Sequence, residues 1–292
     1  MRAASIRNTS AGLNKHDATP AVLWHYTDAA GMHGIIDSNA LRLGNAQCLN
    51  DQSEYQFGWG IINHVFDKAI AKRDVFAAAL AAFRDTTRDL TVGDRLFVCS
   101  LSARRDSLSQ WQRYGANGSG YCLGFKMPQL LQAVKASNIQ LRHLIYSHRT
   151  QTAAVQQVVN TYRPTFNRRN VVPAQNLELA FMRLLLTCTE LALLFKTPHF
   201  QDEQEWRLIL VAPSSQKTLR SKVRFSQRGN FVKPYIDIPV VGASDGLIPI
   251  QQIIYGPMLN TKLARSSLHY FLDATGHRNV KIEQSRLAET WR

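Results

Sequence analysis

Residues 203–211 read EQEWRLILV, and the apolar run that begins at Glu205 predicts a buried strand. Glu203 and Glu205 are two residues apart, so on a strand their side chains would share one face. Two carboxylates at this spacing often do no more than pair with arginine or water. They can also act together on one substrate, and the spacing alone leaves both interpretations open.

Apolar runs elsewhere in the chain predict further strands, and stretches with helical periodicity alternate with them. The predicted strands are 21–26, 41–44, 96–101, 121–125, 142–146, 250–257 and 280–284, with a hairpin over 222–238. The predicted helices are 29–38, 57–66, 74–88, 106–114, 127–136, 151–163, 175–196 and 262–274. This order predicts an α+β fold in which helices pack into and around a strand-rich core.

The composition indicates one large globular protein. The chain has 292 residues, 45% of them apolar, which is enough for a packed core and excludes global disorder. We expect a flexible N-terminus over residues 1–20 and a single domain over 21–292, with a large helical insert at about 127–198. The most apolar helical stretch, 177–195, contains three charged residues and predicts a core helix, not a membrane span. We therefore expect no membrane partner.

The four cysteines are widely spaced and form no C-x-x-C pair, which argues against a zinc ribbon and a secreted disulfide framework. This favours a reduced, cytoplasmic protein. The nine histidines show no H-x-H or H-x-x-x-H spacing, so no metal site is predicted from them. The chain also lacks a P-loop, a G-x-S-x-G elbow and a G-x-G-x-x-G that follows a strand.

The net charge of +14 is unevenly distributed along the chain. Residues 107–177 and 206–236 contain no acidic residue, although both stretches contain several lysines and arginines. Such fields attract anions. They indicate either a solvated basic face or a polyanionic ligand such as a dinucleotide, an RNA or a DNA, and charge alone does not choose among these.

Four short clusters place polar or aromatic residues beside predicted strands. They are WHYT (24–27), LND (49–51) with Glu54, SLSQWQRY (107–114) and EQEWR (203–207). Each has a structural explanation: a histidine in a strand is often a core residue, and Trp111 and Tyr114 have the spacing of a packed helix face. Asn50, Asp51 and Glu54 are typical of a turn and a helix cap.

Taken in order, the clusters resemble a known family. The series H-Y-T, L-N-D-x-x-E, S-x-W-x-x-Y-G-x-x-G-x-G-x-x-L-G-F and E-x-E-W-R, over about residues 22–258, resembles the bacterial domain of unknown function 2971. That name supplies no activity. A more distant resemblance links the layout to the ADP-ribosyltransferase superfamily, which implies a split two-sheet core that clamps NAD, with the large helical insert added to it.

The second resemblance also implies roles for particular residues. The implied catalytic residues are Glu205, Glu203 and His25. The implied NAD-binding residues are His25, Tyr26, Thr27, Ser109, Trp111, Tyr114 and Arg207. Two departures from the superfamily are visible: the chain has no clear S-T-S, and Tyr26 stands where one branch has glycine after its histidine.

The chemistry suits these residue types, because cleavage of the nicotinamide–ribose bond passes through an oxocarbenium-like cation that a carboxylate can stabilise. We therefore predict an NAD-dependent ADP-ribosyltransferase of toxin or phage-defence type, with a protein or nucleic acid as acceptor. One alternative is a non-catalytic module that binds a nucleotide or nucleic acid. Another is a nuclease that holds Mg²⁺ with Asp51, Glu54, Glu203 and Glu205.

Overall fold

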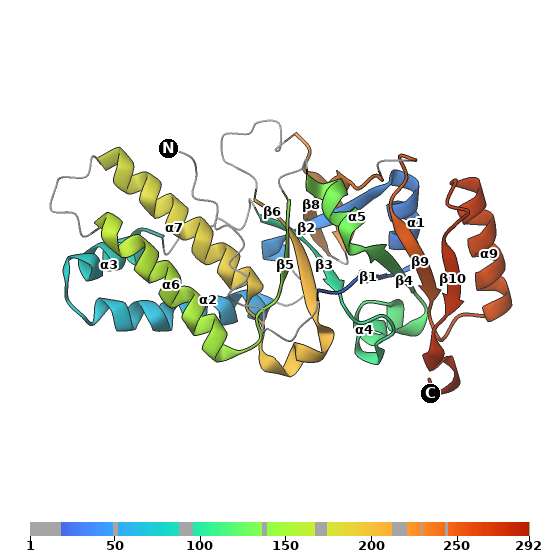
Figure 1. Ribbon diagram of the computed structural model, residues 1–292, viewed down its shortest axis with the longest axis horizontal. Helices are drawn as coiled ribbons and strands as arrows, with labels where there is room; N and C mark the ends of the chain where they lie inside the picture. Colours follow the sequence, from blue (N-terminus) through green and yellow to red (C-terminus); the bar gives the residue numbers. More distant parts are fainter. Residues whose placement is uncertain are drawn as a thin grey trace. The chain divides into compact units, whose positions relative to one another are not determined.

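The computed structural model describes residues 19–48, 52–87, 96–135, 139–166, 174–211, 221–228, 230–242 and 245–291 (Figure 1). The chain divides into two compact units. The helical unit contains residues 1–19, 50–93 and 145–201, and the sheet unit contains residues 20–49, 94–144 and 202–292. This division differs from the expected insert at about 127–198, since residues 127–144 belong to the sheet unit and residues 50–93 join the helical one.

The strands of the sheet unit, within the described residues, form one mixed sheet with the order β10-β9-β4-β1-β3-β2-β8-β7, while β6 pairs with β3 and β5. The bounds are β1 (Val22–Thr27), β2 (Ala40–Asn45), β3 (Leu96–Ser102), β4 (Tyr121–Lys126), β5 (Ile139–His143), β6 (Glu205–Val211), β7 (Arg224–Arg228), β8 (Phe231–Pro239), β9 (Ile250–Tyr255) and β10 (Lys281–Gln284). The pairing of β9 with β10 is parallel, and the other pairings described are antiparallel.

The sheet forks at β3. One edge of β3 pairs with β6 along its full length, from Leu96 to Ser102. The other edge is shared, because β2 pairs at Phe97 and Val98 and β1 pairs at Ser102. The strands β1 and β2 therefore diverge from β3 between these two points, and this fork positions the candidate site.

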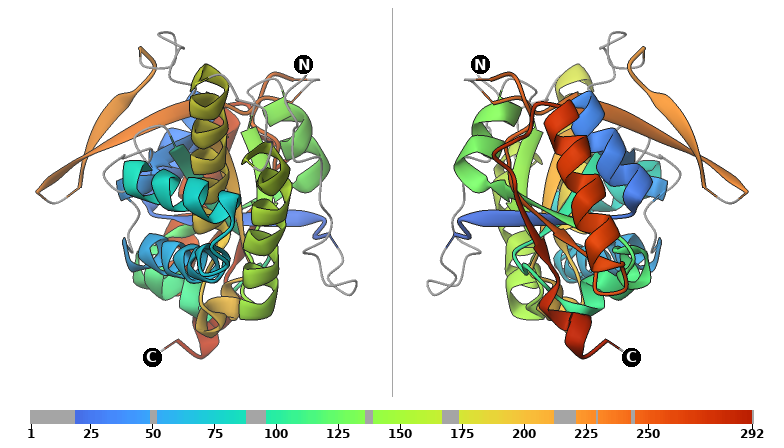
Figure 2. Two further views of the ribbon diagram at one scale, coloured as in Figure 1. Left: turned by 90° about the vertical axis from the view of Figure 1, so that its left-hand side faces the viewer. Right: turned by 90° about the vertical axis from the view of Figure 1, so that its right-hand side faces the viewer.

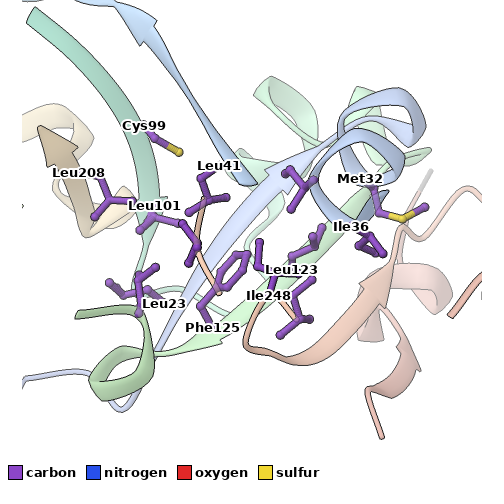
Figure 3. Packing of buried hydrophobic residues seen from close by; sticks show 14 of the residues in the cluster. Leu23, Met32, Ile36, Leu41, Cys99, Leu101, Leu123, Phe125, Leu208 and Ile248 are labelled. Atoms are coloured by element: carbon purple, nitrogen blue, oxygen red, sulfur yellow. The ribbon is translucent and has the colours of Figure 1, made fainter. Parts of the chain in front are cut away.

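One face of the sheet is covered by α1 (Ala29–Ser38), α5 (Met127–Val134) and α9 (Thr261–Ala274), which contribute to one buried apolar core with β1 to β4, β6, β8 and β9. Figure 3 shows Met32 and Ile36 of α1 beside Leu123 of β4 in this core. The helix α1 has its predicted bounds because Asp28 caps it, accepting a hydrogen bond from Gly31 N. In β3, the side chains of Cys99 and Leu101 point into this core.

The glycine-rich segment after α4 (Leu108–Arg113) packs closely against the backbone of neighbouring segments. A Cβ atom on Gly120 would lie 2.3 Å from the carbonyl oxygen of Thr27, and one on Gly256 would lie 2.2 Å from the carbonyl oxygen of Gly118. The Gly256 N–H donates to the Gly120 carbonyl oxygen at 2.9 Å. These glycines let the loop approach β1 and the end of β9 closely.

The helical unit consists of α2 (Gln52–Ile70), α3 (Val75–Thr87), α6 (His148–Phe166) and α7 (Ala174–Leu194). Aromatic rings fill its interior, with Phe83 and Phe166 both in contact with Phe181. Gly58 brings α2 against the backbone of α7, since a Cβ atom there would lie 2.6 Å from Ala192 Cα. Within the described residues, no helix has the length and apolar character needed to cross a membrane.

Candidate functional site

The polar face of β3 and β6 carries the candidate site, which belongs to the sheet unit. Side chains alternate along a strand, so Ser100 and Ser102 point away from the core that receives Cys99 and Leu101. Ser102 pairs in register with Glu205, and Ser100 pairs with Arg207. The strand predicted from residue 205 is thus confirmed as β6, and it sets a carboxylate and a guanidinium beside two hydroxyls.

Glu205 is the centre of this face. Its Oε1 atom accepts a hydrogen bond from Ser100 Oγ at 2.7 Å and another from Arg207 Nε at 2.7 Å. The Glu205 side chain is only 8% exposed and that of Arg207 only 4%, whereas Ser100 is exposed. We call Ser100, Glu205 and Arg207 the Glu205 cluster. Its carboxylate is buried and hydrogen-bonded to an exposed serine.

Glu203 has different partners. It ends a 3-10 helix, Pro198–Glu203, and Gln204 has a left-handed φ of 40°, so the two glutamates are not alternate residues of one strand. The expected shared strand face is therefore wrong. The buried Glu203 Oε1 accepts from Arg113 Nη1 at 2.8 Å, and Ser102 Oγ donates to the Glu203 carbonyl oxygen at 2.6 Å. Arg113 is the last residue of α4, so this contact ties the helix to the sheet.

His25 occupies the fork of the sheet. The Ala103 N–H donates to the Gln204 carbonyl oxygen, so the backbone groups of Ala103 face β6. Successive residues of a strand direct their backbone groups to alternate edges, so those of Ser100 face the other edge of β3, where β1 and β2 diverge. There the His25 Nδ1 atom lies 3.0 Å from the Ser100 carbonyl oxygen. A carbonyl oxygen only accepts, so in the neutral ring Nδ1 carries the hydrogen and Nε2 keeps a lone pair. Burial lowers the pKa of His25, and the Ser100 hydrogen bond opposes that shift.

His25 and Glu205 therefore meet at one residue. Glu205 binds the Ser100 hydroxyl, and His25 binds the Ser100 carbonyl oxygen. They reach Ser100 from different sides, because His25 Nδ1 also lies 4.0 Å from the sulfur of Cys99, whose side chain points into the core. Burial raises the pKa of the Cys99 thiol to about 12, so this neighbour is a neutral thiol.

Lowering the pH from 7.5 to 5.5 is expected to lower the thermal unfolding midpoint, and His25→Asn is expected to remove part of this drop. The pKa of His25 in the folded protein lies below 6.5, so the unfolded chain binds more protons as pH falls through that value. Stability is present above this window and is lost below it. Differential scanning fluorimetry at each pH measures the effect.

The controls for this experiment are two other histidines of the sheet unit. Burial also lowers the pKa of His277, so part of the drop should remain in His25→Asn and disappear only in the double variant with His277→Asn. His269 is exposed on α9, and His269→Asn should keep the full drop. A drop in His25→Asn as large as in the wild type would contradict the placement of His25.

Two of the aromatic candidates are core residues. Trp111 is fully buried, and its Nε1 donates to Asp106 Oδ1 at 2.6 Å. Its ring meets the Tyr26 ring edge to face at 5.1 Å, and the Tyr26 hydroxyl donates to the Arg104 carbonyl oxygen. Burial raises the pKa of Tyr26 far above its usual value, so its hydroxyl stays protonated. The packed-face interpretation is confirmed for Trp111, whose ring is packed in a buried cluster.

The remaining candidates are more accessible. Tyr114, Ser109 and Thr27 are all half-buried. Ser109 Oγ lies 3.1 Å from Ser107 Oγ near the start of α4, and Thr27 ends β1 beside the glycine-rich segment. Among the aromatic groups predicted to bind nicotinamide, Tyr114 is thus the one with solvent access.

Ser100 and Ser102 are the site residues that the sequence analysis missed. The S-x-S spacing within the apolar strand LFVCSLS was the available signal, because it places both hydroxyls on the face away from the core. Asn50 and Asp51 lie outside the described residues. Glu54 lies in the helical unit, where its Oε1 pairs with Lys196 Nζ at 3.0 Å. Among the residues described, no three His, Cys, Asp or Glu side chains form a group suited to a metal ion.

Comparison with known proteins places one part of the chain. No curated protein and no solved structure matches it. Residues 110–208 match the family described as "Protein of unknown function (DUF2971)", a stretch that contains Trp111, Tyr114, Glu203, Glu205 and Arg207. The match is shorter than the resemblance expected over about 22–258 and does not reach His25. From residue 110 to residue 208, the chain is similar to the family of the domain of unknown function 2971.

Proposed function

We propose that this protein consumes NAD by cleaving the nicotinamide–ribose bond, as an ADP-ribosyltransferase or an NAD glycohydrolase. The observation that carries the proposal is the Glu205 cluster, a buried carboxylate hydrogen-bonded to an exposed serine that also binds His25. The described strands form one mixed sheet that forks at β3, and the split two-sheet core that the resemblance implies stays a prediction. The toxin or phage-defence setting and the identity of the acceptor stay predictions.

The proposed reaction breaks the bond between ribose C1′ and the nicotinamide nitrogen, and the bonding electron pair leaves with nicotinamide. The ribose becomes oxocarbenium-like, and the Glu205 carboxylate stabilises its positive charge in surroundings with little water. An oxygen or nitrogen of the acceptor, or water, then bonds to C1′ and gives up its proton. Water as acceptor makes the enzyme a glycohydrolase, and a macromolecule makes it a transferase.

The neighbours of Glu205 would act as positioning residues. Arg207 and Ser100 each donate to the same carboxylate oxygen, Oε1, which fixes the position of the carboxylate. In this proposal, the expected NAD-binding role of Arg207 is replaced by its contact with Glu205. His25 reaches Ser100 from the core side of the sheet, so in this proposal it holds the Ser100 backbone in place and its expected contact with the ribose is given up. Tyr114 is the proposed stacking partner for nicotinamide.

The carboxylates that would have to bind Mg²⁺ already pair with cationic side chains, which makes the metal-dependent nuclease a weaker alternative. Glu203 and Glu205 pair with Arg113 and Arg207, and Glu54 pairs with Lys196. A carboxylate that ligates Mg²⁺ would have to exchange its cationic side chain for the metal. Three such exchanges would be needed, whereas the NAD proposal uses the Glu205 cluster as it stands.

The test is nicotinamide release from NAD by the purified protein, with and without cell lysate. The wild type should release nicotinamide, and Glu205→Gln should lower the rate by about 10²–10³-fold, the usual cost of losing one electrostatic stabiliser. The exposed Glu289 gives a matched control, because Glu289→Gln makes the same chemical change away from the site and should keep the full rate. Release without lysate would identify a glycohydrolase.

Two results would overturn this proposal. One is the absence of nicotinamide release by the wild type in every condition. The other is an unchanged rate in both Glu205→Gln and Glu203→Gln. Circular dichroism of each variant shows whether a lost rate comes from unfolding. Ser100→Ala is a second test of the cluster, since it removes one hydrogen bond to Glu205 and leaves the charges of Glu205 and Arg207 in place.

A further inference from the structure

The hairpin of β7 and β8 extends from the edge of the sheet. Figure 2 shows it as a long two-stranded arm, coloured orange, that projects away from the rest of the sheet. The hairpin predicted over 222–238 is thus confirmed, and it contains no acidic residue before Asp237. Its base is fixed on β2, where Arg42 pairs with Asp237 and its guanidinium lies 3.7 Å from the centre of the Tyr235 ring.

The two faces of the arm differ in chemistry. Directly opposed residues of an antiparallel pair share a face. The pairs Arg224↔Tyr235 and Ser226↔Lys233 form a basic face, to which the pair Arg228↔Phe231 adds the Phe231 ring at the tip. Arg224 is exposed on this face, whereas Lys233 Nζ donates to the Cys48 carbonyl oxygen at 3.0 Å. The pairs Phe225↔Pro234 and Gln227↔Val232 form an apolar face on the other side.

The apolar side chains of the arm are exposed. The exposed fractions are 64% for Phe225, 74% for Phe231 and 66% for Val232. Phe225 and Val232 lie on the apolar face of the arm, and Phe231 lies at the tip of the basic face. Large apolar side chains exposed to water on both faces of one hairpin indicate an interaction site. Basic residues lie close by, because Lys222, in the turn before β7, and Arg224 of β7 are both exposed.

We propose that this hairpin is a binding arm for single-stranded nucleic acid. The basic residues would contact phosphates, and Phe225 and Phe231 would stack on bases, the combination that single-strand binding proteins use. A single strand fits better than a duplex, because base faces are accessible to an aromatic ring only when the bases are unpaired. A second copy of this chain fits less well, since two acid-free basic hairpins would repel each other.

The arm proposal is independent of the NAD chemistry. It rests on the exposed rings and the charge of β7 and β8, and neither strand contains a residue of the Glu205 cluster. An inactive enzyme could still bind nucleic acid, and an active one could fail to bind it. The two proposals therefore succeed or fail in separate assays.

The experiment is fluorescence anisotropy of labelled 12-nucleotide RNA and DNA single strands, titrated with the full-length protein at several salt concentrations. Phe225→Ser with Phe231→Ser should weaken binding about tenfold or more and leave the salt dependence unchanged. Lys222→Gln with Arg224→Gln should reduce the slope of log affinity against log salt by about 1.4, at roughly 0.7 for each lost phosphate contact to a single strand.

Matched controls come from the exposed side of α9. Leu263→Ser with Tyr270→Ser removes two exposed apolar side chains there, and Lys262→Gln with Arg265→Gln removes two exposed charges. Both control variants should bind within twofold of the wild type. Unchanged unfolding midpoints in all four variants show that the substitutions act on binding.

Several outcomes would overturn the arm proposal. The wild type could fail to bind a single strand at low salt, or the α9 variants could weaken binding as much as the hairpin variants, which would assign binding to the net charge of the whole chain. A duplex bound as tightly as a single strand would remove the role of the rings. Loss of a dimer in the Phe225 and Phe231 variants, with unchanged affinity for nucleic acid, would assign the arm to contact between copies.

Discussion

Arg207→Met is expected to lower the free energy of unfolding by about 3–5 kcal/mol, the usual cost of removing one partner from a buried ion pair. The Glu205 carboxylate would stay buried and lose one of the two donors to its Oε1 atom. A buried charge that loses its counter-charge must be rehydrated, protonated or left unsatisfied, and each outcome favours the unfolded chain. Urea unfolding followed by circular dichroism measures the change.

The matched control for Arg207 is Arg42, which pairs with Asp237 of the neighbouring strand β8. The Arg42 and Asp237 side chains are 52% and 30% exposed, so water screens their interaction. Arg42→Met is expected to cost about 1 kcal/mol or less, as exposed pairs do. Equal costs for the two arginines would show that the Glu205 cluster is solvated, and its proposed role in stabilising a cation would lose its physical basis.

A double variant separates folding from chemistry in this cluster. Replacing a whole buried pair with uncharged groups of similar size is often close to neutral, so Arg207→Met with Glu205→Gln should recover most of the lost stability. It should nevertheless release no more nicotinamide than Glu205→Gln alone. A folded double variant with the wild-type rate would remove Glu205 from the proposed mechanism.

The sequence predicted the elements whose signals are local. The helix 29–38 has its expected bounds because Asp28 supplies its cap, and the hairpin over 222–238 follows from its alternating pattern and its turn residues. The strand expected at 142–146 instead runs from Ile139 to His143. Its position is set by pairing with β6, from Ile139↔Leu210 to His143↔Trp206. The local pattern of apolar residues does not predict such pairing.

The division into two units also depends on long-range contacts. The helices α6 and α7 were expected, but their packing with α2 and α3 joins segments as far apart in sequence as Gly58 and Ala192. Gly58 gave no sign of its role, since a glycine in a helical pattern is ordinarily only unfavourable. Its close contact with Ala192 becomes meaningful only when α2 and α7 are side by side.

The charged residues of the candidate site were predictable from the sequence, but their hydrogen-bond partners were not. Glu205 and Arg207 stood out by residue type, and the expectation that such carboxylates pair with arginine is confirmed. Ser100 did not stand out, because a serine within an apolar strand acquires a role only through the strand that pairs with it. Trp111 resembled a ligand-binding residue, since its spacing alone does not distinguish a ring in the core from one in a cleft.

Glu54→Ala is expected to destabilise the helical unit by about 1.5–3 kcal/mol, the usual contribution of a hydrogen bond to a charged group, because it removes the carboxylate 3.0 Å from the buried Lys196 ammonium. The Lys196 side chain is 1% exposed and the Glu54 side chain 15% exposed, so the two partners are not equivalent. Lys196→Met should cost less, because methionine fills the apolar path of the lysine stem and Glu54 can still reach water. Glu54 also lies in the first turn of α2, where a negative charge is favourable.

Hydrogen exchange of α2 and α7, measured by mass spectrometry, reports this loss within the helical unit. Arg84→Met breaks the exposed pair with Asp67 in the same unit and should leave the exchange of both helices nearly unchanged. A larger loss of stability in Lys196→Met than in Glu54→Ala would contradict the conclusion that Lys196 is the partner whose charge depends on the pair. The nuclease alternative predicts instead that Mg²⁺ protects the wild-type helices and not those of Glu54→Ala, whereas an ion pair with Lys196 predicts the same exchange with and without Mg²⁺.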